Sequence, residues 1–366
     1  MKKLMEKIGE ELVKAFETAG YDSSYAKVTV SNRPDLCEFQ CNGAMAAAKQ
    51  YRKAPIQIAS AVVDALEKGG VIGEAEAAAP GFINLKVNPE ALSEYLNQMQ
   101  MDQDLSVEKA REPKTIIVDY GGANAAKPLH VGHLRSAIIG ESIKRMGRFM
   151  GHHVIGDVHL GDWGLQMGLI ITELAERKPE LPYFDESYSG EYPEEPPFTI
   201  SELEEIYPAA SARSKEDAEY KEKALTATFE LQQGRSGYRA LWKHIMTVSV
   251  ADLKKNYSNL NVDFDLWKGE SDVQDYIPRM AEYMKDAGYA YYDQGALIVD
   301  VKEESDTKEI PPCIILKSDG AALYTTTDLA TIMDRMEHYH PDEMIYLADK
   351  RQELHFTQVF RCARKT

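Results

Sequence analysis

Residues 115–118, with the sequence TIIV, form a short and uninterrupted apolar run. Runs of this kind are typical of strands that are buried on both faces of a parallel sheet. After a loop, apolar residues recur at helical spacing from Val131 to Phe149, and residues 153–158 (HVIGDV) predict a second strand. A strand, a helix and a second strand in this order form a βαβ unit, so the sequence predicts an α/β fold with a parallel sheet.

The residues before this unit predict a small α+β domain. We expect a helix over residues 2–19, a strand over 27–30, another helix after Pro55 and a strand over 82–87. Pro55 suits the first position of a helix, because the N–H that proline lacks has no intrahelical partner there. The polar residues 100–114 are expected to link this domain to the α/β unit.

The residues after the unit predict a long insertion and then a return to alternating elements. Residues 199–260 are expected to be mostly helical, and 273–315 to mix helices and strands. A helix over 328–339, a strand over 343–347 and a helix from Gln352 follow. The chain therefore predicts an α/β domain whose sheet is interrupted by an insertion.

Composition and charge narrow the class of protein. The chain has 366 residues, of which 44% are apolar and 28% charged, and this is ordinary for a globular protein. No apolar run approaches the roughly 18 residues of a membrane span, and the N-terminus lacks the apolar block of a signal peptide. We therefore expect a cytoplasmic location and no membrane partner. Four cysteines are too few for a disulfide framework.

The formal net charge of −17 argues against a nucleic-acid partner only if it is evenly spread. Residues 183–366 carry 21 basic and 35 acidic side chains, whereas residues 111–182 carry 9 and 8. Much of the excess lies in 183–230, which we expect to be a solvated insertion and not a site. The segment around the first predicted strand is nearly neutral, so the total charge does not exclude an anionic ligand there.

Two histidines stand where the buried strand gives way to the helix. His130 and His133 flank Val-Gly, and the amides and dipole of a helix N-terminus favour an anion at this place. Gly132 lets a ligand approach the backbone, and both imidazoles can donate hydrogen bonds to phosphate oxygens. The alternative is a helix cap with two incidental histidines, because short motifs often match by chance.

The longer text around the histidines resembles class I aminoacyl-tRNA synthetases, whose signature at this junction is His-Ile-Gly-His. Within that class it is similar to the arginyl-tRNA synthetase family, in which Asp-Tyr, Ser-Ala-Pro-Asn, Ala-Lys, HVGHLRS and GDWGTQFG follow in order. The corresponding text here is DYGGAN (119–124), AK (126–127), HVGHLRS (130–136) and GDWGLQMG (161–168). Gly121 replaces the family's serine, so backbone amides or water would have to replace one hydroxyl beside the amino acid.

The resemblance implies a domain organisation. Residues 1–105 would form the family's additional tRNA-binding domain, and residues 112–366 a Rossmann-like class I catalytic domain with an insertion at roughly 180–315. This catalytic domain would be incomplete, and the family's C-terminal anticodon-binding domain would be absent. We expect such a fragment to keep its substrate pocket and to aminoacylate poorly or not at all.

The resemblance also implies a reaction, namely ATP-dependent activation of L-arginine and its transfer to tRNA(Arg). Such a transfer needs mainly positioning and charge stabilisation, which fits a motif with imidazoles and no nucleophile. His130, Gly132, His133 and, on the nucleotide side, His355 would bind ATP, with Mg²⁺ accompanying it. The family's Lys-Met-Ser-Lys-Ser loop has no match here, and Lys127 is the candidate that replaces it; a solvated loop lysine is the alternative.

Two further segments resemble the part of the family that binds arginine. Tyr324 and Asp328, in DGAALYTTTDLA (319–330), stand four apart and would share one helix face. A guanidinium is planar, always charged and presents five donors, so its selection calls for a carboxylate and oriented acceptors. Gln352 would also hold the amino acid. The alternatives are an aspartate that caps a helix and a glutamine exposed on a first turn.

Two residues of the first strand and loop complete the implied arginine pocket. Asn124 follows the family pattern, and Asp119 could face either the α-ammonium or the guanidinium group. No carboxylate cluster in the sequence identifies a protein-bound metal site, and Cys37 and Cys41 lack a second pair of zinc ligands.

In the N-terminal domain, Phe39, Gln40 and Asn42 resemble the family's tRNA-binding turn and helix start. An aromatic ring and amides on a loop could stack on an unpaired base and read it. We expect the chain to be a monomer.

Two other functions compete with arginine activation. One is a different class I synthetase or a small-molecule adenylyltransferase, against which Tyr324 and Asp328 argue. The other is a non-catalytic RNA-binding or scaffold relative, against which the retained His130, His133 and Gln352 argue.

Overall fold

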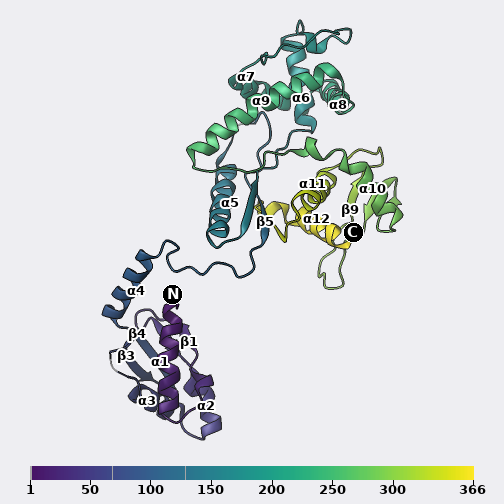
Figure 1. Cartoon of the computed structure of the whole chain (residues 1–366). Helices are drawn as coiled ribbons and strands as arrows, with labels where there is room; N and C mark the ends of the chain where they lie inside the picture. The colour runs from purple at the N-terminus through teal and green to yellow at the C-terminus, as the bar shows by residue number, and fades with distance from the viewer. Residues whose placement is uncertain (1, 68, 128) are drawn as a thin grey trace. The chain divides into compact units, whose positions relative to one another are not determined.

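The computed structural model describes residues 2–67, 69–127 and 129–366. The chain divides into two compact units, residues 1–108 and residues 109–366 (Figure 1). Each unit has its own core, and each is described by itself below. No helix in the described ranges combines the length and the apolar character that crossing a bilayer requires.

The first unit is an antiparallel sheet covered by helices. Its strands pair in the order β1-β2-β4-β3. Ile8, Leu12 and Phe16 of the first helix are buried among Ile58 and Ile83, which come from the third helix and from β4. The expected helices and strands are confirmed, and β4 has the predicted bounds. The elements are α1 (Leu4–Thr18), β1 (Val28–Val30), β2 (Phe39–Cys41), α2 (Gly43–Tyr51), α3 (Pro55–Asp64), β3 (Ile72–Ala78), β4 (Phe82–Val87) and α4 (Pro89–Met101).

The second unit contains the predicted βαβ unit. Strands β5 (Thr115–Asp119), β6 (His153–Asp157) and β10 (Glu343–Tyr346) form a parallel sheet in the order β10-β5-β6. Helix α5 (Val131–Phe149) connects β5 to β6 and has the predicted bounds. Because β5 is the central strand, Ile117 and Val118 are fully buried, as the uninterrupted apolar run indicated.

A helical insertion follows β6 in the chain. Its four helices pack around apolar residues that include Met167, Ile170, Leu203 and Leu241 (Figure 1). The mostly helical expectation for this region is thus confirmed. The helices are α6 (Leu165–Arg177), α7 (Ile200–Glu216), α8 (Ala218–Gln232) and α9 (Ser236–Asn259).

The chain then forms a small antiparallel sheet packed with helices, and afterwards returns to the parallel sheet with β10. A short antiparallel sheet, β7-β8-β9, packs with helices around Val299, Ile315 and Leu329. The elements are a 3-10 helix (Glu270–Val273), α10 (Tyr276–Asp286), β7 (Tyr291–Asp293), β8 (Ala296–Val299), β9 (Cys313–Leu316), α11 (Tyr324–Tyr339) and α12 (Glu353–Lys365).

Helix α11 begins earlier than its apolar periodicity alone predicted. The apolar periodicity predicted the helix from Asp328, whereas the family resemblance placed Tyr324 and Asp328 on one helix face. The helix begins at Tyr324, as the second expectation requires. The hydroxyl of Thr326 accepts a hydrogen bond from the Leu323 N–H at 2.9 Å and donates one to the Ile315 carbonyl at 2.6 Å. A β-branched threonine is a weak helix former, but here its hydroxyl caps the first turn and ties it to β9.

Candidate active site

The loop between β5 and α5 is fixed by hydrogen bonds to neighbouring segments. The Gly121 N–H donates to Ser136 Oγ at 3.1 Å, the Ala125 N–H to the Gly161 carbonyl at 3.0 Å and the Ala126 N–H to Ser249 Oγ at 2.9 Å. Gly121 has φ of +91°, and a Cβ atom there would lie 2.9 Å from the Phe264 ring. A glycine in place of the family's serine therefore fits both the backbone conformation and the space.

His130 and His133 lie stacked at the N-terminus of α5. Their ring centroids are 3.9 Å apart. His130 Nδ1 accepts a hydrogen bond from the Gly132 N–H at 3.1 Å, and His133 Nδ1 accepts one from the His130 N–H at 3.2 Å. An accepting Nδ1 carries no proton, so the neutral ring keeps its proton on Nε2. Both histidines thus cap the helix and keep one N–H donor; we call His130, Gly132 and His133 the histidine end.

The protonation of His133 is biased toward the neutral form. Burial lowers the pKa of His133, and the nearby His130 and Lys127 lower it further. A neutral imidazole with its proton on Nε2 is a hydrogen-bond donor that adds no full charge of its own. Such a donor suits an anion whose charge increases during a reaction.

A cleft of about 760 Å³ opens beside the β5–α5 loop. It is lined by Lys127 from this loop, Gln166 from α6, Tyr207 from α7, Tyr324 from α11 and Glu270. The Lys127 ammonium lies 4.8 Å from the centroid of the Tyr207 ring. The cleft thus brings Lys127 and Tyr324 to one place, although they are far apart in the sequence. Residues of the acidic insertion, among them Tyr207 and Lys215, line it too, although no sequence pattern predicted them beside a site.

Glu270 is a residue of the cleft that the sequence did not reveal. Burial raises the pKa of Glu270 to about 7, with further contributions from Asp162 and Asp328. Burial and the nearby Glu270 carboxylate also raise the pKa of Tyr324. Glu270 and Asp328 thus lie close enough to Tyr324 to influence its ionisation, and we call these three residues the acidic end. The sequence around Glu270 contains no recognisable motif. Its proximity to α11 is created by the fold and could not be read from the sequence.

The GDWG segment supports the turn on which Glu270 lies. Asp162 accepts hydrogen bonds from the Ser271 hydroxyl at 2.6 Å and from the Ser271 N–H at 3.0 Å. Burial raises the pKa of Asp162 to about 6. A Cβ atom on Gly269 would lie 2.6 Å from an Asp162 oxygen, so this close approach needs glycine.

Asp328 and His355 contact each other across α11 and α12. His355 Nε2 lies 2.5 Å from Asp328 Oδ2, and both side chains are partly exposed. His355, predicted on the nucleotide side, is thus a neighbour of the acidic end. Gln352 is exposed at the start of α12. Of the catalytic, ATP-binding and arginine-binding residues predicted from the sequence, Lys127 and Tyr324 line the cleft. The described residues that line it do not include Asp119, Asn124, His130, Gly132, His133, Asp328, Gln352 or His355.

Asp119 and Asn124 each contact another residue of the second unit, Arg335 and Gly161 respectively. Asp119 Oδ2 accepts a hydrogen bond from the buried Arg335 guanidinium at 2.6 Å, and Arg335 also donates to Asp157 at 2.7 Å. Burial raises the pKa of Asp119, and Arg335 opposes this rise. A Cβ atom on Gly161 would lie 2.3 Å from Asn124 Oδ1, so the Asn124 side chain lies against that glycine.

The predicted tRNA-binding residues of the first unit do not share a loop. Phe39 and Gln40 belong to strand β2, where they pair with Val30 of β1 and with Asn84 of β4. The Gln40 amide donates to the Asn84 side chain at 2.9 Å. Among the three, Asn42 alone follows the strand, and it is exposed before α2. The expectation of a loop was wrong for Phe39 and Gln40, because ladder hydrogen bonds hold both.

Comparison with known proteins identifies the family. The profile described as tRNA synthetases class I (R), catalytic domain, matches residues 95–366, and that of the arginyl tRNA synthetase N terminal domain matches residues 2–87. The chain belongs to the arginyl-tRNA synthetase family. Its second unit accordingly has the predicted Rossmann-like class I catalytic fold, with parallel β10, β5 and β6.

Curated relatives and solved structures agree with this assignment. The arginine–tRNA ligases of Agathobacter rectalis and Alkaliphilus oremlandii are 66% and 62% identical to this chain, cover 100% of it and are themselves covered to 62%. The chain therefore spans about three fifths of the length of these relatives. The arginyl-tRNA synthetase of Plasmodium falciparum has the same fold, with a TM-score of 0.70 and 23% identity over 100% of this chain and 63% of its own.

Proposed function

We propose that this chain contributes the amino-acid-activating part of an arginine–tRNA ligase. In this reaction the carboxylate of L-arginine attacks the α-phosphorus of ATP and pyrophosphate leaves, after which the arginyl group passes to the 3′ end of tRNA(Arg). The observation on which this proposal rests is the acidic end, where Glu270 and Tyr324 line the cleft and the nearby Asp328 carboxylate raises the pKa of both.

The acidic end fits a guanidinium group. Asp328 and Glu270 would supply the negative charge and Tyr324 a further oxygen, and a guanidinium can donate to all three at once. The raised pKa of Glu270 indicates that burial and the neighbouring carboxylates disfavour its ionised form. An arriving cation would favour its ionised form and so contribute to affinity. Asp119, Asn124 and Gln352 remain predicted contacts of the amino acid.

The histidine end fits the phosphates of ATP. The Nε2–H donors of His130 and His133 and the amides at the start of α5 would stabilise the charge that develops on the α-phosphate oxygens. Lys127 would contact the pyrophosphate, and Mg²⁺ would arrive with ATP. None of these residues forms a covalent bond with the substrate, so the chain acts by positioning and charge stabilisation.

Ligand-induced thermal shifts test this proposal. Each of the twenty amino acids is added to the chain with and without ATP, since a ligand that binds the native state raises the melting temperature. Stabilisation by arginine and by no other amino acid is the expected result. Stabilisation by another amino acid would favour a different class I synthetase, and no response to any would favour a non-catalytic relative.

A further inference from the structure

The segment 261–270 connects α9 to the cleft and ends at Glu270. We propose that Glu141 and Lys144, two buried charged residues of α5, are positioning residues that fix this segment and thereby place Glu270 in the arginine pocket. This inference rests on the proposed function. Neither residue lines the cleft within the described ranges, so both would act through the segment and not on the substrate.

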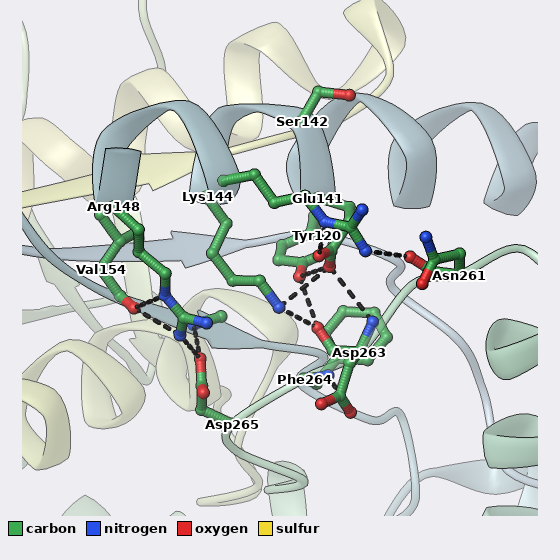
Figure 2. Close-up of polar contacts among 12 residues, drawn as sticks. Tyr120, Glu141, Ser142, Lys144, Arg148, Val154, Asn261, Asp263, Phe264 and Asp265 are labelled. Atoms are coloured by element: carbon green, nitrogen blue, oxygen red, sulfur yellow. Dashed lines mark hydrogen bonds and ion pairs between the residues drawn. The ribbon is translucent and has the colours of Figure 1, made fainter. Parts of the chain in front are cut away.

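The two residues hold both polar backbone groups of one residue, Asp263 (Figure 2). The Lys144 ammonium donates to the Asp263 carbonyl, which also accepts from the Tyr120 hydroxyl at 2.8 Å. Glu141 Oε2 accepts from the Asp263 N–H at 3.2 Å and lies 2.9 Å from the Lys144 ammonium. A shift of Asp263 along or across α5 would therefore break several hydrogen bonds together.

Two other residues of α5 form hydrogen bonds or ion pairs with the same segment on either side of Asp263. Arg145 donates to the Asn261 carbonyl at 2.5 Å, and Arg148 lies 2.6 Å from the Asp265 carboxylate. Asp265 also accepts from the Gly156 N–H of β6 at 2.7 Å. Helix α5 thus fixes three alternate residues of the segment, and its own N-terminus bears the histidine end.

After Asp265, the segment forms backbone hydrogen bonds with β6 and with the residues that follow β6, up to Glu270 at the cleft. The Leu266 N–H donates to the Gly156 carbonyl at 3.0 Å, and the Leu160 N–H donates to the Lys268 carbonyl at 2.7 Å. The Glu270 N–H then donates to the Leu160 carbonyl at 3.0 Å. Hydrogen bonds thus hold Asp263, Leu266, Lys268 and Glu270 in succession, so we expect a change of register at Asp263 to be transmitted along the segment to Glu270.

The burial of this ion pair is better explained by positioning than by stability. The side chains of Lys144 and Glu141 are only 3% and 8% exposed. Two charges removed from water lose hydration, and apolar residues of similar volume often serve the fold as well or better. Directional hydrogen bonds to a backbone carbonyl and N–H, in contrast, specify one register.

A double-mutant cycle tests the inference on the full 366-residue chain. Dissociation constants for arginine and for ATP are measured by calorimetry for the wild type, Lys144→Met, Glu270→Gln and the double variant. We expect Lys144→Met to weaken arginine binding about tenfold and to change ATP binding less than about twofold. In the Glu270→Gln background, Lys144→Met should weaken arginine binding less than about threefold. The effects of two substitutions that act through the same contact are not additive.

Two further variants separate positioning from general stability. Arg361→Met removes a comparable ion pair with Asp306 in the same unit and is expected to leave arginine affinity unchanged. Tyr120→Phe deletes one hydrogen bond to Asp263 and provides the same cycle should Lys144→Met not fold. Additive losses in the cycle, or parallel losses of arginine and ATP affinity, would overturn the inference. If the wild type binds no arginine, the proposed function itself fails.

Discussion

The histidine end and the acidic end of the site differ in how the chain builds them. His130, Gly132 and His133 are contiguous, and one strand-to-helix junction fixes all three. Glu270, Tyr324 and Asp328 come from two segments that the chain brings together over more than fifty residues. The histidine end is therefore built from local contacts, whereas the acidic end depends on the packing of α11 and on the segment 261–270.

The first and largest effect is expected from Asp328→Ala. This substitution removes a carboxylate from the acidic end and leaves the histidine end untouched. Loss of one partner of a charged hydrogen bond costs about 3 kcal/mol, so arginine affinity should fall on the order of a hundredfold. Calorimetric titrations with arginine and with ATP measure the two affinities. An unchanged arginine affinity would refute the role of Asp328.

His133→Ala should have the opposite selectivity. Removing one donor to a phosphate costs about 1.5–3 kcal/mol, so ATP affinity should fall roughly ten- to a hundredfold while arginine affinity stays constant. The same calorimetric titrations provide the measurement. Since the ring also caps α5, the melting temperature serves as a control. A loss of arginine affinity equal to that of ATP would show that the two ends are not separable.

The acidic end should respond to pH near neutrality. Burial raises the pKa of Glu270 to about 7, and we expect arginine to bind its ionised form. Arginine affinity should therefore level off near pH 8 and fall as the pH drops through 7, by at most about tenfold per pH unit. Titrations at pH 6, 7 and 8 check this.

Glu270→Gln is the matched control for the pH dependence. The neutral amide should flatten the dependence, and it should raise the stability of the free chain at pH 8. The sign follows because the folded-state pKa of Glu270 lies above its usual value, so ionisation opposes folding increasingly as the pH rises from about 4.5 past 7. A pH dependence that persists in Glu270→Gln would assign it to another group.

Gln352→Ala is expected to have the smallest effect. Gln352 is exposed and uncharged, and a neutral hydrogen bond contributes about 0.5–1.5 kcal/mol, or roughly two- to tenfold in affinity. Arginine titrations of this variant would measure it directly. A loss as large as that of Asp328→Ala would show that the acidic end is not the main source of affinity.

The sequence predicted the parts of the fold that depend on local patterns. The bounds of α5 and β4 follow from apolar periodicity, and the central position of β5 follows from its uninterrupted apolar run. The apolar periodicity missed the start of α11 because the hydroxyl of Thr326 bonds to β9, a contact that only the fold creates.

The candidate site shows the same division. Lys127 and Tyr324 were predicted from matching text, and the structure brings both to one cleft. Glu270 lies outside any recognisable motif, and its proximity to Asp328 and Tyr324 arises from a ladder along β6. The contact of Asp119 with Arg335 was also missed, because only the fold brings these two residues together. They are more than two hundred positions apart in the sequence.

The comparison of arginine with citrulline tests the central claim most directly. Citrulline has nearly the same shape as arginine, but it carries a neutral urea in place of the guanidinium. If the carboxylates of Glu270 and Asp328 select positive charge, calorimetry should show arginine binding with at least about a hundredfold higher affinity than citrulline. Equal affinities for the two amino acids would contradict the account.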